Sequence, residues 1–214
     1  MPLVLAGATS GSITIDVPAT AGTNTLTIPA STGTVITTAS TGQNIPKAAL
    51  PTGSVLQVVQ SVVTSTVSTS AASVGTFYAV SGFTVSITPT SSSSKILVLL
   101  DANMCTSSDT DQGVMYQLTR GGSAIYLGDA ASNRSRVTGV APNGGNAGNI
   151  NFAIPKVSCV YVDSPATTSS TTYGISVCST SSSRTIYLNR TYSDADANYS
   201  GRSASSITVM EIAA

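Results

Sequence analysis

The stretch FTVSITPTSSSSKILVLL, residues 83–100, decides the fold class. Apolar side chains alternate with Thr and Ser over 83–88, which is the pattern of a β-strand buried on one face. Pro89 and the run of serines that follows predict a turn. The block 96–100 is apolar at every position, and therefore on both sides, so we expect a central strand.

Strand-like segments of the same kind continue after and before this stretch, and no segment has the periodicity of an amphipathic helix. Short strands with turn signals every ~8–12 residues are typical of a sandwich or barrel. We therefore expect an all-β fold in which residues 54–214 form a jelly-roll-like antiparallel β-sandwich. The further strands are expected at 55–67, 114–119, 124–127, 136–140, 151–162, 173–177, 186–188 and 206–212.

The start of the chain contains an internal repeat. PATAGT at 18–23 returns as PASTGT at 29–34, and strand-like stretches at 13–17 and 25–28 precede the two copies. Pro ends each stretch because it lacks an N–H group, and Gly allows the turn that follows. Strands this short are marginal alone. We expect them to pair with the same segment of neighbouring copies or to form a small hairpin on the main domain.

These features divide the chain into three parts. Residues 1–40 are expected to form a β-repeat that serves as a stem or attachment segment. Residues 41–53 contain two Pro and two Gly with little periodicity and are expected to be a linker. Residues 54–214 are the expected sandwich.

Charge and composition exclude several functions. The chain has nine basic and nine acidic side chains, a net charge of zero and only 8% charged residues. This composition does not favour electrostatic binding to nucleic acid. No apolar run is long enough for a membrane span, and the N-terminus lacks the features of a signal peptide. We expect Cys105, Cys159 and Cys178 to be small buried residues rather than a disulfide or metal site.

Catalytic chemistry has few candidate groups in this sequence. There is no His, which removes the commonest general base and most transition-metal sites. We expect no enzyme, no cofactor and no metal. A glycosidase would need two carboxylates about 5–9.5 Å apart across a cleft, and paired carboxylates in one loop are weak evidence for that arrangement.

One polar loop, 193–203, combines residues that suit a binding site. Asp194 and Asp196 stand beside Asn198, and Tyr192 and Tyr199 flank them. Carboxylates and amides bind sugar hydroxyls or Ca²⁺, and tyrosine rings stack on sugars. The alternative is a solvated turn in which the Asp side chains bond backbone N–H groups.

A second candidate loop spans 142–148 and contains Asn143 and Asn146. Loops of this kind carry binding functions because the strands position them. We therefore include both asparagines among the expected receptor-binding residues. Another carboxylate pair, Asp109 and Asp111, lies in a third polar loop.

Several segments resemble the small tail-fibre proteins of marine and cyanobacterial tailed phages. The opening AGATSGSITIDVPATAGTNTLTIPASTGTVITT resembles a segment near the start of such virion proteins. Segments spread over the rest of the chain resemble their main domain. These are GSVLQVVQ at 53–60, the stretch at 84–100, LGDAASNRSR at 127–136, YVDSPATTSSTTYGISV at 161–177 and SASSITVMEIAA at 203–214.

The resemblance implies a homotrimeric tail appendage that is assembled in the host cytoplasm and contacts a glycan or protein of the host surface. Its N-terminal segment would bind another tail protein, such as an adaptor, nozzle or fibre stem. A capsid decoration or head-fibre protein is the main alternative. A tailspike enzyme and a cellular adhesin or lectin are the other two.

Overall fold

The structure is a computed structural model. It describes residues 3–6, 12–15, 47, 50–71, 74–107, 113–141, 152–180 and 184–214. Every helix or strand named in these ranges is a β-strand. The chain separates into two compact units, Met1–Asn44 and Ile45–Ala214. The fold is therefore all-β, as the sequence predicts.

The first unit contains a short hairpin. Strand β1 (Leu3–Ala6) pairs antiparallel with β2 (Ser12–Ile15). The expected strand at 13–17 corresponds in part to β2. The repeated segments at 18–23 and 29–34, with the expected strand at 25–28, lie outside the described residues.

Eleven strands form the two sheets of the second unit, and all their pairings are antiparallel. Their bounds are β3 Val55–Val63, β4 Val67–Ala71, β5 Tyr78–Ile87, β6 Lys95–Thr106, β7 Val114–Arg120, β8 Ser123–Ile125, β9 Gly139–Ala141, β10 Lys156–Asp163, β11 Thr171–Ser179, β12 Arg184–Leu188 and β13 Ser205–Ile212.

The larger sheet has six strands in the order β3-β13-β6-β12-β4, with β10 also paired to β6. Strand β6 lies in the middle of this sheet. Strand β10 pairs with one edge of β6, while β13 pairs with the first part of its other edge and β12 with the last part. This confirms the expectation of a central strand at 96–100. The smaller sheet has five strands in the order β5-β11-β7-β8, with β9 also paired to β7.

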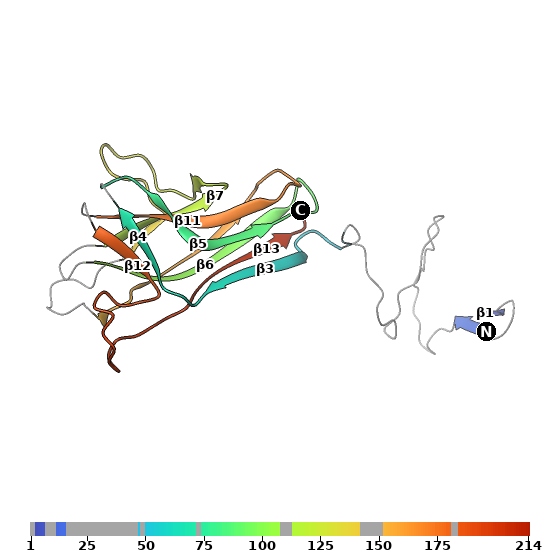
Figure 1. Cartoon of the computed structure of the whole chain (residues 1–214). Coiled ribbons are helices and arrows are strands. Elements are labelled where there is room, and N and C mark those ends of the chain that lie inside the picture. Colours follow the sequence, from blue (N-terminus) through green and yellow to red (C-terminus); the bar gives the residue numbers. More distant parts are fainter. Residues whose placement is uncertain are drawn as a thin grey trace, which may run out of the picture. The chain divides into compact units, whose positions relative to one another are not determined.

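The two sheets share one apolar core, and Figure 1 shows β5, β11 and β7 in one layer over β6, β13 and β3 in the other. Alternation along each strand sends every second side chain inward. Phe83 and Ile175 of the smaller sheet and Ile96, Val98 and Ile207 of the larger one are among the buried core residues. The sandwich-like arrangement follows from this alternation.

Several strand ends differ from those expected. The long strand at 55–67 is two strands, β3 and β4, with a break at 64–66. The strand expected at 151–162 begins only at Lys156, after Pro155. Of the strand expected at 136–140, only Gly139 and Val140 belong to β9, because Thr138 Oγ1 instead donates to the carbonyl of Tyr126 at 3.0 Å.

A charged cluster joins the two sheets near one end of the sandwich. Asp163, at the end of β10, is buried and accepts hydrogen bonds from Arg120 Nη1 at 2.8 Å and from Tyr173 Oη at 2.7 Å. Burial and the hydrogen bond to Asp163 raise the pKa of Tyr173. The phenol therefore remains a donor to the carboxylate at all ordinary pH values.

A second buried carboxylate, Glu211 of β13, fixes the turn between β5 and β6. Its side chain is 0% exposed. It accepts from Gln57 Nε2 at 2.6 Å, from Thr90 N at 2.6 Å and Oγ1 at 2.7 Å, and from Ser94 Oγ at 2.8 Å. Burial by itself raises the pKa of Glu211, but these hydrogen bonds outweigh burial and hold the pKa below its usual value.

None of the three cysteines forms a disulfide, as the sequence predicts. Cys105 and Cys178 are buried, and Cys159 is half-buried. Burial raises the pKa of Cys105 and of Cys159 to about 11. Both thiols are therefore protonated and unreactive near neutral pH.

Candidate functional site

The polar loop expected at 193–203 connects β12 to β13 and lies far from the point where the chain enters the sandwich. At that point Gly53 N donates to Ala213 O at 2.8 Å, and Ala213 N donates to Ser54 O at 2.9 Å. The whole length of β13 separates these residues from the β12–β13 loop, which Figure 1 shows at the other end of the sandwich. The loop is thus distal within this unit.

A buried asparagine closes the base of the loop. Asn189 is 0% exposed and adopts a φ of 63°, a left-handed conformation that Asn tolerates better than most residues. Its Nδ2 donates to Val63 O at 2.7 Å and to Ser65 O at 3.1 Å, and its Oδ1 accepts from Ser205 Oγ at 2.6 Å. These bonds tie both ends of the loop to β3 and β13.

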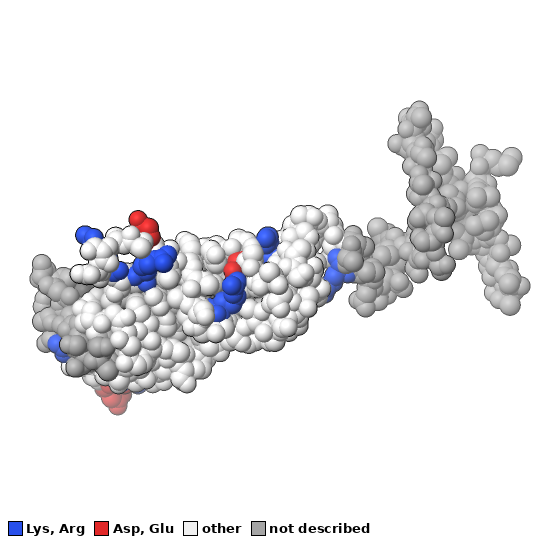
Figure 2. Space-filling model, turned by 90° about the horizontal axis from the view of Figure 1, so that it is seen from above, with Lys and Arg blue, Asp and Glu red and all other residues white. Residues whose placement is uncertain are grey.

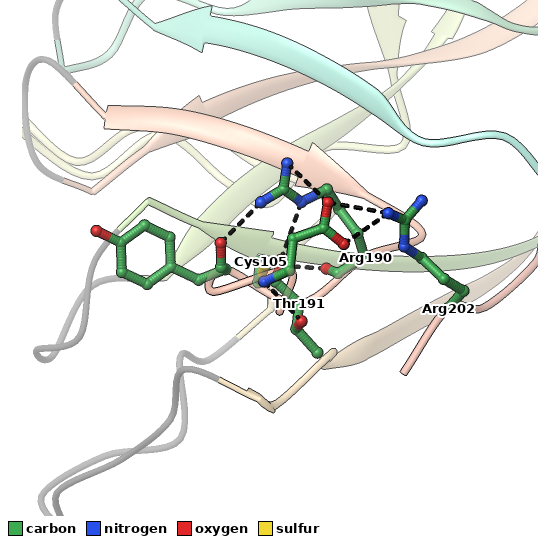
Figure 3. A network of polar contacts seen from close by, with 6 residues as sticks. Cys105, Arg190, Thr191 and Arg202 are labelled. Atoms are coloured by element: carbon green, nitrogen blue, oxygen red, sulfur yellow. Dashed lines mark hydrogen bonds and ion pairs between the residues drawn. The ribbon is translucent and has the colours of Figure 1, made fainter. Parts of the chain in front are cut away.

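Two arginines, Arg190 and Arg202, both contact the carboxylate of Asp194, and Figure 3 labels the two arginines. Arg202 Nη2 lies 2.8 Å from Asp194 Oδ1 and 2.9 Å from Oδ2, and Arg190 Nη1 lies 3.4 Å from Oδ2. Arg190 and Arg202 also form an isolated antiparallel β-bridge. The carboxylate of Asp194 is therefore neutralised inside the loop, and the two positive charges beside it disfavour a cation there.

Arg190 anchors the cluster to its surroundings. Its Nη2 donates to Tyr192 O at 2.8 Å, and its guanidinium lies 4.2 Å from the centre of the Tyr187 ring. Cys105 Sγ donates to Arg190 O at 3.2 Å from β6, as Figure 3 shows. The loop is thus braced by ionic, cation–π and backbone contacts.

A polar cavity of about 520 Å³ lies elsewhere, near the chain entry, but the loop has its own cavity of about 390 Å³. Asp194, Asp196, Ser200 and Arg202 line the loop cavity together with two alanines. The Oγ of Ser200 is buried and has no hydrogen-bond partner among the described residues. The exposed carboxylate of Asp196 and the guanidinium of Arg202 supply acceptors and donors, which suits a hydroxylated ligand such as a sugar.

The structure therefore brings together part of the expected site. Asp194 and Asp196 share the cavity, whereas Asn198 is exposed. The tyrosines have partners outside the cavity lining: Tyr192 stacks on Tyr187 with centroids 6.4 Å apart, and Tyr199 meets Phe152 edge-on at 4.7 Å. Tyr199 is nevertheless 60% exposed, so its ring remains open to a ligand.

The other expected site residues lie outside the described residues. These are Asn143 and Asn146 of the 142–148 loop, and the pair Asp109 and Asp111.

Three residues of the site were not expected from the sequence. Arg190, Arg202 and Asn189 acquire their roles only when the loop closes on itself. The spacing of Arg190 and Asp194, four residues apart, was the one available signal for an ion pair.

Among the residues that the structure describes, no three Asp, Glu or Cys side chains gather in a group that could hold a metal ion. Within the same ranges, no helix has the length and hydropathy needed to cross a bilayer.

The geometry thus identifies the β12–β13 loop, with its cavity, as the candidate binding site. No known protein-family model matches the chain, and no curated protein matches it either.

Proposed function

We propose that the chain is a virion structural protein of a tailed phage, a homotrimeric tail fibre or its tip that contacts the host surface and catalyses no reaction. One observation carries the proposal. The sandwich receives the chain at one end and presents the braced β12–β13 loop, with its polar cavity, at the other. A domain attached at one end and equipped for contact at the other suits a fibre tip.

The strand order supports a jelly roll, a fold common in viral capsid proteins and lectins. Strands β12 and β13 both pair with the same edge of β6, and β8 and β9 both pair with β7, so each of these two pairs counts as one interrupted strand. Strands β3 and β4 pair with β13 and β12 in turn and count as a third interrupted strand. Numbered along the chain, the resulting eight strands have the order 1-8-3-6 in one sheet and 2-7-4-5 in the other. Consecutive strands alternate between sheets except at 4-5, as in a pair of Greek keys.

The surface supports an appendage that works outside a cell. Figure 2 shows one face on which charged side chains are few and scattered. Hydroxyl groups keep such a surface hydrated, and their hydrogen bonds are not screened by salt as ion pairs are. The sequence resemblance to small tail-fibre proteins agrees with this surface, and it assigns attachment to other tail proteins to the N-terminal segment.

The position of the chain on purified particles tests the proposal. A cryo-EM map is expected to contain three copies in a tail appendage, with the β12–β13 loops pointing away from the tail. Copies on the capsid lattice would favour the decoration or head-fibre alternative, and absence from the particle would refute both.

Competition for adsorption tests the loop. Purified protein is expected to block phage adsorption, and Asp196→Ala is expected to weaken this block about 5-fold or more, because a lost hydrogen bond costs about 1 kcal/mol or more. Asp129→Ala, in another loop, is the matched control. Equal blocking by the cavity variant and the wild type would show that the loop does not contact the receptor.

A further inference from the structure

The outer face of the larger sheet carries exposed aliphatic side chains. Val59 and Val63 of β3 pack against the core, so alternation directs Val58 and Val62 outward. These two valines are 56% and 55% exposed. An outward face of an antiparallel sheet is ordinarily polar, so this face departs from the usual pattern.

The apolar side chains form a band that crosses the sheet. The strand register places Val162 of β10 opposite Leu97 of β6, Leu97 opposite Met210 of β13, and Met210 opposite Val58 of β3. Val160, which is 63% exposed, lies beside this row on β10. Directly paired side chains on one face contact each other, so the band is continuous from one edge strand to the other.

The smaller sheet has a different outer face. There Thr84 and Ser86 of β5 and Thr172 of β11 point outward and are exposed. Ser86 and Thr172 share a hydrogen bond of 2.7 Å. The exposed valines are therefore concentrated on the larger sheet, which carries Val58, Val62, Val160 and Val162, whereas the smaller sheet exposes one valine of a described strand, Val140 of β9.

The band ends at an unprotected edge. Strand β3, VLQVVQSVV, ends the strand order of its sheet and pairs with β13 alone. It contains no charged residue and no Pro, the devices that usually protect a free edge. An apolar face that continues to an open edge is a surface suited to another protein chain.

Charge favours further copies of this chain as the occupants of this face. The charges on this face are Lys95 at one end and the Asp101–Lys156 ion pair of 2.6 Å, and the chain has no net charge, so copies do not repel one another. Four strands ~4.8 Å apart and seven residues ~3.3 Å apart span roughly 450 Å². Turned toward a common threefold axis, three such faces would bury at most about 1,350 Å² in all, or about 450 Å² for each pair of copies, so this face supplies part of the trimer contact.

We propose that copies of this chain associate through the outer face formed by β10, β6, β13 and β3. The inference deepens the proposed function and rests on its claim that the protein acts as a homotrimer. It places the contact between copies on this sheet, and it leaves the hydroxyl-covered sheet and the β12–β13 loop free.

Light scattering after size exclusion, on the full chain, tests this inference. The wild type is expected to have the mass of a trimer. Val58→Lys with Val162→Lys is expected to be monomeric, with association weakened at least ~100-fold, because an unpaired ammonium would be buried in the contact. Thr84→Lys with Ser86→Lys, on the other outer face, is the matched control and should remain trimeric.

Circular dichroism of each variant verifies that it is folded, and the milder Val58→Thr with Val162→Thr should weaken association in the same direction.

A wild-type monomer, or a folded lysine variant with wild-type mass, would overturn the inference. If the Val58→Lys, Val162→Lys protein still assembles and the chain is found in a tail appendage, the interface lies elsewhere and the proposed function stands. If assembly fails as expected but particles lack the chain, the proposed function fails and the interface stands.

Discussion

Glu211 is the residue whose environment differs most from that of an ordinary carboxylate. It is fully buried, yet every contact that the structure gives its two oxygens is a hydrogen bond from a neutral donor. An ionised carboxylate can accept all four of these hydrogen bonds. A protonated Glu or a Gln at this position would instead carry a donor of its own, and that donor would face one of the four surrounding donor groups. The charge at this position is therefore required by the local structure.

Glu211→Gln is expected to lower the free energy of unfolding by about 2–3 kcal/mol at neutral pH, because it breaks a buried network. Because the folded pKa is lowered, the stabilisation by Glu211 is full above the unfolded pKa of ~4.3 and is lost as the pH falls through the folded value. Urea denaturation from about pH 7 to pH 3 measures both effects.

Asp196→Asn, an exposed carboxylate in the β12–β13 loop, is the control for that comparison and should change stability by less than ~0.5 kcal/mol. A Glu211→Gln protein as stable as the wild type at neutral pH would show that the network does not depend on the charge.

At the scale of single elements, the β12–β13 loop is held by side chains and not by a strand ladder. Arg190 contacts Asp194, the carbonyl of Tyr192 and the ring of Tyr187. Arg190→Gln is expected to increase amide hydrogen exchange in 190–203 about 10-fold or more, because loss of these bonds favours local opening. Mass spectrometry of the exchanged peptides measures this change.

Arg136→Gln is the matched control, because Arg136 braces a different loop through Gly128 O at 2.7 Å. It should leave exchange in 190–203 unchanged. Unaltered exchange in the Arg190→Gln protein would mean that Asn189 and Arg202 hold the loop without it.

The sequence was informative about elements where alternation or an apolar block is strong. The segments at 83–87, 96–100 and 173–177 are all strands, because burial of one or both faces determines their pattern. Strand ends were less predictable. Strand β6 continues past Asp101 to Thr106 because β12, distant in sequence, pairs with its last residues.

The candidate site was only partly predictable for the same reason. Asp194 and Asp196 were evident as polar loop residues, and they do line one cavity. The arginines that neutralise Asp194 and the asparagine that closes the loop act through contacts that arise only in the folded chain. Single-sequence patterns contain no signal for such contacts.

At the scale of the whole molecule, stability depends little on surface charge. Four ion pairs join the described residues, and Asp163 is the one member that is deeply buried. Exposed pairs contribute little and are screened by salt. The free energy of unfolding is therefore expected to change by less than about 1 kcal/mol between ~0.05 and ~1 M NaCl.

Urea denaturation at several NaCl concentrations measures this dependence, and Asp163→Asn, which breaks the buried pair, provides the comparison. A large loss of stability in salt would reveal that charge interactions contribute far more than the described ion pairs indicate.

The closed base of the β12–β13 loop has a consequence for how this protein can change. The chain leaves one edge of β6 after Leu188 and returns to the same edge at Ser206, and the bonds of Asn189 seal the junction. Residues 195–201, between the braced ends of the loop, take part in no described strand pairing. The sequence of this part of the loop can therefore change, by engineering or by selection, and alter what the protein binds while the β-sandwich that carries the loop stays the same.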